Sequence, residues 1–398
     1  MFIHAMAMGM WFVPLGSVLD AHGYHGVKAL AFATSGIAAF VSPLIFGSLA
    51  DNRYSPVRIL RWLTVATAAT LTLAATAIEL KWPAGVLLLL VQLHALCASP
   101  TWSITTTIVF SRLSDAKREY GPLRAMATVG WMVGCWIISW LSWDLSPRTG
   151  YGSAVIWLAV SAFTFVLPAV APPTPAPHRN WKQRLGLDAI SLLRNKDHRV
   201  VFVTAALFNI PLCAFYPFTP THLLELGFLH PTAYMTLGQI TEIIAMFLLA
   251  ALLARWRLKT IFLTGIGFAV VRYVACAFDT KAALLTGIAL HGFAFTLFFI
   301  TAQIYLDQRI DPAWRARGQS LLTLMMSGIG NTLGYLGCGA WFHVCATQKW
   351  TTIPLFGPNV QLPMQALPNW TLYWGGLAVV VAVIWVWFAC TYTGRKKA

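Results

Sequence analysis

The segment YMTLGQITEIIAMFLLAALLARW, from Tyr234 to Trp256, is long and apolar enough to cross a lipid bilayer as an α-helix. About 20 helical residues, each rising about 1.5 Å, span a hydrocarbon core about 30 Å thick. Eleven other apolar segments of comparable length are spaced along the chain and separated by polar turns or linkers. The sequence therefore predicts an all-α membrane protein with twelve transmembrane helices.

The composition of the chain excludes a soluble globular protein. Of the 398 residues, 58% are hydrophobic and only 10% are charged, whereas soluble domains carry about 25% charged residues. The net charge of +15 would suit a protein that binds nucleic acid, but 22 of the 28 basic residues lie in alternate loops and the C-terminal tail. In membrane proteins the loops rich in lysine and arginine are the cytoplasmic ones. We expect a multi-pass protein of the cell inner (cytoplasmic) membrane with both termini cytoplasmic and no nucleic-acid partner.

A proline-rich stretch, residues 172–177, ends the sixth apolar segment because proline cannot continue a helix. We therefore predict a six-helix bundle over residues 1–171, a basic cytoplasmic linker over 172–199, and a second six-helix bundle over 200–398. Within the linker, residues 185–193 are amphipathic and are expected to lie along the membrane surface. Two similar six-helix halves are typical of the major facilitator superfamily.

The turn GSLADNR, residues 47–53, resembles the cytoplasmic loop motif of that superfamily, in which an acid and arginines hold the halves closed on the inner side. The resemblance implies a gating role for Asp51 and Arg53. An ordinary basic turn is the alternative.

Glu242 is the only one of the 13 acidic residues that lies in the middle of an apolar segment. A carboxylate at this depth costs about 2.5 to 3.5 kcal/mol on insertion scales, and such residues usually mark a pathway for substrate or protons. Gln239 lies three residues earlier on the same helical face. We interpret Glu242 as a functional residue; a structural ion pair is the alternative.

Other polar and aromatic residues lie in the middles of helices that would surround a substrate between two halves. Flat aromatic faces beside amide and carboxylate groups suit a ligand with a flat ring and several hydroxyls, which describes a nucleoside and, less exclusively, a sugar. Each aromatic side chain could instead face lipid, and His291 could be a simple helix contact. The candidates are Arg124, Thr128, Trp131, Cys213, Tyr216, His291, Phe295 and Asn331.

Neither a metal site nor an enzyme is expected. The seven cysteines are scattered through apolar stretches without paired spacing, and Glu242 with His291 does not form a catalytic constellation. We predict no cofactor and no obligate protein partner.

Several stretches, in order along nearly the whole chain, resemble the nucleoside:H⁺ symporter family of the major facilitator superfamily, in particular its nucleoside transporter branch. They are WFVPLG (Trp11 to Gly16), LRAMATVGW (Leu123 to Trp131), LGLDA (Leu185 to Ala189), AFY (Ala214 to Tyr216), LGQITE (Leu237 to Glu242) and HGFAF (His291 to Phe295).

The resemblance implies substrate-contacting roles for Arg124, Thr128, Trp131, Gln239, Glu242, His291 and Phe295. The chain departs from the family at two places. Thr296 stands where the family usually has an acid implicated in proton coupling, and Cys213 and Tyr216 stand at positions that carry amides in the best-known members. We include these three residues among the predicted substrate contacts.

These features together predict import of nucleosides by alternating access. The substrate, protons and the lipid bilayer are then the expected partners. Proton coupling would run through Glu242, with His291 as a second proton carrier. The alternative, favoured by Thr296, is an uncoupled facilitator or a symporter for another hydroxyl-rich solute such as a sugar.

Overall fold

The computed structural model describes residues 1–52, 55–114, 116–167, 187–351 and 365–394. The helices of the first part are α1 (Phe2–Phe12), α2 (Leu15–Ala21), the 3₁₀ turn η1 (His25–Val27), α3 (Lys28–Asn52), α4 (Pro56–Glu79), α5 (Ala84–Phe110), α6 (Ala116–Trp140) and α7 (Arg148–Phe163).

The second part begins with the 3₁₀ helix η2 (Leu187–Arg194) and continues with α9 (Lys196–Leu212), α10 (Phe215–Glu225), α11 (Pro231–Met235), α12 (Leu237–Arg255), α13 (Leu258–Ala277) and α14 (Lys281–Phe295). It ends with the π-helix η3 (Thr296–Ile300), α15 (Thr301–Arg309), α16 (Pro312–Thr323), the π-helix η4 (Leu324–Gly330), α17 (Asn331–Cys345) and α18 (Trp370–Thr391). Strands β1 (Ala346–Thr351) and β2 (Gln365–Pro368) pair antiparallel between α17 and α18, with Trp350 opposite Ala366.

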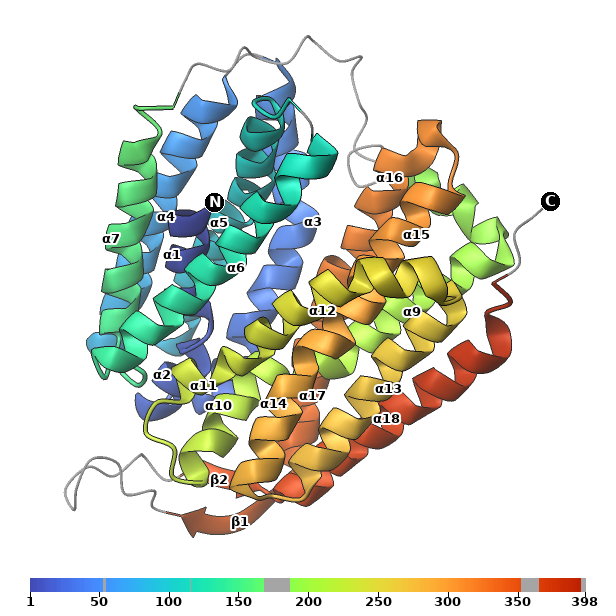
Figure 1. Ribbon diagram of the computed structural model, residues 1–398. Helices are drawn as coiled ribbons and strands as arrows, with labels where there is room; N and C mark the ends of the chain where they lie inside the picture. Colours follow the sequence, from blue (N-terminus) through green and yellow to red (C-terminus); the bar gives the residue numbers. More distant parts are fainter. Residues whose placement is uncertain (53–54, 115, 168–186, 352–364, 395–398) are drawn as a thin grey trace.

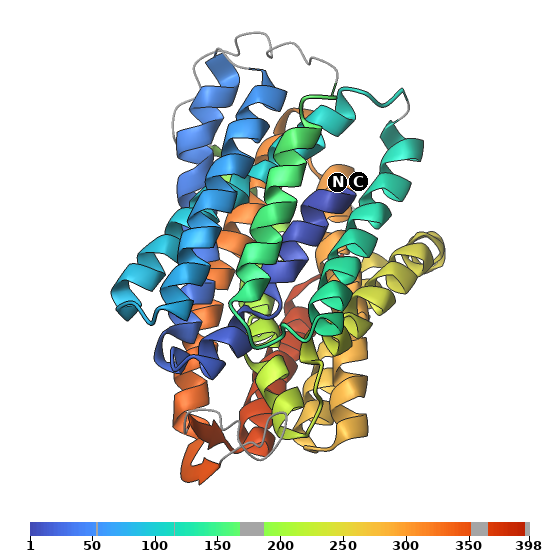
Figure 2. The same ribbon diagram turned by 90° about the vertical axis from the view of Figure 1, so that its left-hand side faces the viewer.

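The helices form two bundles that lie side by side, α1–α7 in blue to green and α9–α18 in yellow-green to red (Figure 1). In the first bundle α1 packs against α6 and α7, and α4 packs against α5 and α7; in the second, α13 packs against α14 and α18, and α9 packs against α17 and α18. The bundles meet where α3 packs on α17 and η4, and where α2 packs on α10. Figure 2, which turns the molecule by 90°, shows that the long helices share one general direction, with the β ribbon at one end.

Hydrogen bonds join the two bundles at the end formed by α2, α10 and α11. Thr221 on α10 donates to the Asp20 carboxylate at 2.9 Å, and Lys28 donates to the Thr221 hydroxyl at 3.2 Å. The Asp144 carboxylate accepts from the backbone N–H of Thr232 at 3.0 Å. This end of the interface between the bundles is therefore closed by polar contacts.

Nine helical segments within the described residues are long and apolar enough to cross a membrane. Three expected spans are outside this set. They correspond to α3, to α7, which has only 16 residues, and to the α16–α17 segment with its internal π-helix. The chain is a multi-pass helical membrane protein.

Several spans that the sequence predicts as continuous helices are interrupted. Pro14 lies between α1 and α2, and Pro211 and Pro217 flank the junction of α9 and α10. Proline removes one backbone N–H and its ring clashes with the carbonyl four residues earlier, so each junction loses regular hydrogen bonding. The π-helices η3 and η4 interrupt two further spans without any proline.

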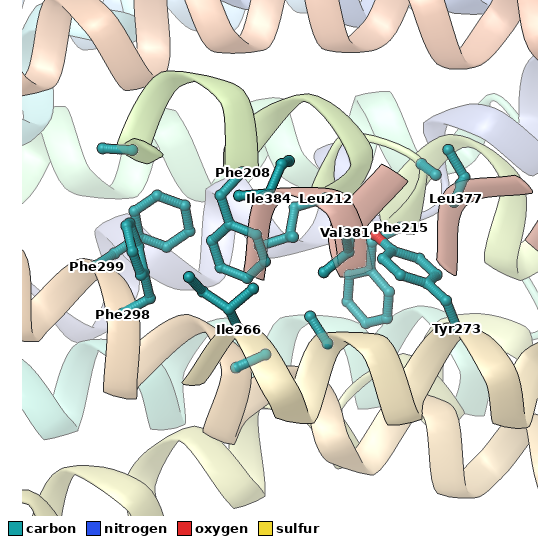
Figure 3. Packing of buried hydrophobic residues seen from close by; sticks show 14 of the residues in the cluster. Phe208, Leu212, Phe215, Ile266, Tyr273, Phe298, Phe299, Leu377, Val381 and Ile384 are labelled. Carbon is teal, nitrogen blue, oxygen red and sulfur yellow. The ribbon is translucent and has the colours of Figure 1, made fainter. Parts of the chain in front are cut away.

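Aromatic packing fixes α9 inside the second bundle (Figure 3). The Phe208 ring contacts the ring of Phe298 edge-on at 5.0 Å and stacks on that of Phe299 at 5.5 Å. The Tyr273 hydroxyl donates to the Pro211 carbonyl at 2.6 Å. These contacts hold α9 against α13 and η3 within the second bundle.

The beginning of the predicted linker, residues 172–186, lies outside the described residues. Its end forms η2, in which Ala189 is fully buried and Asp188 makes an ion pair with Arg317 of α16 at 3.2 Å. The apolar face that we predicted for a membrane surface therefore packs at least partly against α16.

Candidate functional site

A cavity of about 400 Å³ lies between the two bundles, within the range of sites that bind small molecules. Both bundles contribute to its wall. From α1, α5 and α6 come Ala5, Met8, Phe12, Trp102, Arg124, Ala127, Thr128 and Trp131; from the second bundle come Asn209, Leu212, Cys213, Tyr216, Gln239, Glu242, His291, Phe295, Met326, Ser327, Asn331 and Tyr335.

Nine of the ten substrate contacts predicted from the sequence line this cavity, and Thr296 does not. Thr296 begins the π-helix η3 and is fully buried. Its Oγ1 atom has no hydrogen-bond partner in the part of the chain that the structure describes. Of the predicted gating pair, Asp51 lies in the last turn of α3, and Arg53 lies outside the described residues.

Opposite charges enter the cavity from the two bundles, Arg124 from α6 and Glu242 from α12. The Arg124 guanidinium lies over the Trp102 ring at 4.9 Å. One turn before Glu242, the Gln239 amide donates to the Tyr216 hydroxyl at 3.2 Å. A carboxylate, an amide and a phenol are thus available within one wall, and a cation is available from the opposite bundle.

Glu242 reaches this position because α12 and α14 approach closely. A Cβ atom at Gly292 would lie only 2.1 Å from the Glu242 backbone nitrogen, so only glycine fits there. The Thr241 hydroxyl on α12 also reaches α14, where it donates to the Ala289 carbonyl. The contact fixes the direction of the Glu242 side chain relative to α14.

Three aromatic rings, tilted to one another, lie together in one part of the cavity wall. The Phe12 ring lies 5.1 Å from the Tyr216 ring and 6.1 Å from the Trp131 ring, and Trp131 lies 6.2 Å from Tyr216. Phe12 comes from α1, Trp131 from α6 and Tyr216 from α10. Such rings provide apolar faces on which a planar ligand can stack.

His291 is held by a buried arginine. The Arg272 guanidinium, 1% exposed, donates to His291 Nδ1 at 2.9 Å and lies 4.6 Å from the centre of the Phe215 ring. Phe215 in turn stacks on the His291 ring at 4.0 Å. Arginine has no acceptor and stays protonated, so Nδ1 must accept and the hydrogen of a neutral ring sits on Nε2. This geometry favours His291 as a hydrogen-bond donor and disfavours the proton-carrier role expected from the sequence.

Sequence reasoning singled out Asn331 but did not single out Asn209, which lines the same cavity. Asn209 Nδ2 donates to Asn331 Oδ1 at 2.6 Å. A usable signal was the spacing, because Asn209 lies four residues before Cys213 and therefore on the same face of α9.

The fold resembles solved transporters. Two crystal structures of the nucleoside transporter NupG each cover 98% of this chain, and the chain covers 98% and 97% of theirs, with TM-scores of 0.86 and 0.83 at 22% identity. A crystal structure of the POT family transporter PepTSo matches with a TM-score of 0.69 at 12% identity, covering 98% of this chain and 97% of its own. Two helical bundles around a cavity that both of them line are the fold that this chain shares with these proteins.

Sequence relatives identify the family. "Putative nucleoside transporter YegT" of Escherichia coli (strain K12) is 33% identical over 98% of this chain and 91% of its own length. The nucleoside permease NupG of the same strain is 24% identical over 85% of each chain. The model of the family described as "Nucleoside H+ symporter" matches residues 1–395. The chain belongs to this family, whose members are transporters and not enzymes, as the sequence predicted.

Proposed function

We propose that the protein imports nucleosides by alternating access, with residues 1–171 and 200–398 as the two moving halves and 172–199 as the linker. Helices α3 and α7 and the α16–α17 segment would complete the count of twelve transmembrane spans. The support is that both bundles line one cavity, so that rocking of one against the other would expose it to each side in turn. The loop charges favour the inner membrane with both termini cytoplasmic, where Asp51 and Arg53 would act as the gate.

The observation that carries this proposal is the chemistry of the cavity wall, a carboxylate and an amide beside aromatic rings. Glu242 and Gln239 would bind the ribose hydroxyls, since a carboxylate accepts and an amide both donates and accepts. Trp131, Tyr216 and Phe295 would stack against the base. Further polar contacts would come from the other predicted residues that line the cavity, Arg124, Thr128, Cys213 and His291.

Proton coupling would depend on Glu242, which is the acidic residue among the side chains known to line the cavity. When ionised it binds the ribose hydroxyls as an acceptor, and a proton from the outside neutralises it during the inward transition. His291 would donate from Nε2 and not carry a proton, because Arg272 occupies Nδ1.

A second candidate is an uncoupled facilitator, or a symporter for a sugar. The observation that favours it is Thr296, a buried hydroxyl at the position where the family resemblance leads us to expect an acid. Counterflow whose rate does not change when a pH gradient is imposed would identify the facilitator.

The test is uptake of radiolabelled uridine and adenosine into proteoliposomes with and without an inward proton gradient. We expect the wild-type protein to accumulate nucleoside above equilibrium and Glu242→Gln to retain exchange but lose accumulation. The matched control is Glu79→Gln, because Glu79 accepts from Tyr151 at 2.6 Å on the surface of the first bundle and does not line the cavity. Concentrative uptake that survives in Glu242→Gln would refute the coupling role, and absence of nucleoside uptake by the wild type would refute nucleoside transport.

A further inference from the structure

Two asparagines from distant parts of the chain meet in the cavity wall. Asn209 on α9 uses its Nδ2 group twice, donating to the Asn331 Oδ1 atom at 2.6 Å and to the Met326 carbonyl at 3.0 Å. Because a backbone carbonyl can only accept, the contact with Met326 fixes which end of the Asn209 amide carries hydrogen.

Counting the donors and acceptors of the pair shows which of its groups are available to a ligand. Asn209 Nδ2 has two hydrogens and both are used, and its Oδ1 atom accepts no hydrogen bond from the residues that the structure describes. Asn331 Oδ1 accepts from Asn209 and lies 3.6 Å from the Cys213 thiol, so its Nδ2 donor remains. Both side chains are partly exposed and line the cavity. The pair therefore offers an acceptor beside a donor to whatever occupies the site.

The backbone around the pair is built for close approach. A Cβ atom at Gly330 would lie 3.0 Å from the Asn209 Cβ atom, and one at Gly334 would lie 2.6 Å from the Cys213 sulfur. Gly330 is the last residue of the π-helix η4, which also contains the Met326 carbonyl that orients Asn209. Single-turn π segments often occur at functional sites, and fixed side chains of this kind lose little freedom when a ligand binds.

We propose that the Asn209–Asn331 pair binds the edge of the base of the transported nucleoside, while Gln239 and Glu242 on another wall hold the ribose. The proposal rests on nucleoside transport as proposed above and adds how the substrate is oriented. Nucleobase edges carry a ring or exocyclic N–H directly beside an acceptor. The N–H would donate to Asn209 Oδ1 and the acceptor would receive a hydrogen from Asn331 Nδ2.

The test compares nucleosides that differ only at this edge. The probes are uridine with 3-methyluridine and inosine with 1-methylinosine, as competitors of labelled uridine or inosine exchange in proteoliposomes. In each pair the methyl group replaces the ring N–H and leaves the ribose unchanged. We expect the wild type to favour the unmethylated nucleoside about tenfold or more, the effect of one well-formed hydrogen bond.

Asn209→Ala removes the acceptor, so the preference should fall to about twofold or less. Asn331→Asp keeps an oxygen to accept from Asn209 but loses the donor, and should weaken uridine or inosine binding about tenfold; it also serves if Asn209→Ala does not fold. The comparison variant Gln239→Ala should weaken both members of a pair equally, because they share the ribose.

Three results can be told apart. The base-binding proposal is overturned if the wild type does not prefer uridine or inosine over its methylated partner. It is also overturned if Asn209→Ala keeps the preference and Asn331→Asp binds uridine or inosine as the wild type does. A wild type that exchanges neither nucleoside overturns the proposed function itself. Loss of preference in Asn209→Ala, with preference kept in Gln239→Ala, supports the proposal.

Discussion

Replacement of Lys28 by methionine should open the interface between the bundles at the α2–α10 end. Lys28 donates to the Asp20 carboxylate at 2.7 Å, and the two side chains are only 2% and 4% exposed. The second bundle covers this pair. Thr221 bonds to both charged groups, and the Lys28 ammonium lies 5.0 Å from the ring centre of Phe218 and 5.3 Å from that of Phe342.

The size of the effect follows from the burial of Asp20. In the closed arrangement Lys28→Met leaves a carboxylate in the interface with Thr221 as its remaining donor, whereas separation of the bundles returns the carboxylate to water. Breaking a buried pair by removing one partner costs about 3 to 5 kcal/mol. We take the lower value, about 3 kcal/mol, because Thr221 still donates; this changes the equilibrium between closed and open interfaces by more than about 100-fold.

Electron spin-echo distance measurements can detect this shift. Spin labels at Gly26 and Leu229, both exposed and near this end on opposite bundles, report the separation. The exposed Cys390 and the partly buried Cys97 would be replaced by serine, and the other five cysteines are buried. We expect a single short distance in the background protein and a dominant longer distance in Lys28→Met.

The double variant Asp20→Asn/Lys28→Met is the matched control. With both charges removed, the closed interface no longer contains an uncompensated carboxylate, so the short distance should return. If Lys28→Met gives the same distances as the background protein, or if the double variant stays as open as the single one, the buried charge does not control this interface and the reasoning fails.

Two further predictions concern packing. Gly330→Ala should lower the preference for uridine over 3-methyluridine while the protein still elutes as a folded species, because its Cβ atom would lie 3.0 Å from Asn209 Cβ and displace the amide. An unchanged preference would show that the amide position is unimportant. Trp374→Phe should lower the apparent melting temperature more than Trp385→Phe does. The Trp374 indole donates to buried His222 Nδ1 at 3.0 Å. Its loss leaves that buried acceptor unpaired, which lowers the free energy of unfolding by about 1 to 3 kcal/mol. The Trp385 side chain, in contrast, is 39% exposed. Equal shifts in the two variants would contradict this.

The helices were predictable because the mean hydropathy of a segment is taken over about 20 residues, and a local break in the helix hardly changes that mean. Pro14 and Pro217 were visible in the sequence, but membrane helices tolerate proline when neighbouring groups satisfy the freed backbone. The π-helices carry no such signal. Each adds a residue to a turn and rotates the following side chains by about 100°. Thr296 was predicted as a substrate contact because it stands where the resembled family usually has an acid, but in the structure it begins η3 and its buried side chain does not line the cavity.

Residues of the candidate site were predictable where the residue type alone is unusual for its segment. Glu242 is the clearest case, because the free-energy cost of a carboxylate in an apolar segment is high unless it faces a cavity or a partner. Asn209 gives no such signal, since an asparagine in a membrane helix commonly bonds to a neighbouring helix. Its partners, Met326 and Asn331, lie 117 and 122 residues away. Only those tertiary contacts decide which atoms of the two amides are hydrogen-bonded to each other and to the Met326 carbonyl. On the proposed base-binding role, the ligand preference of the site depends on how α9 packs against η4, because that packing sets the orientation of the Asn209 amide.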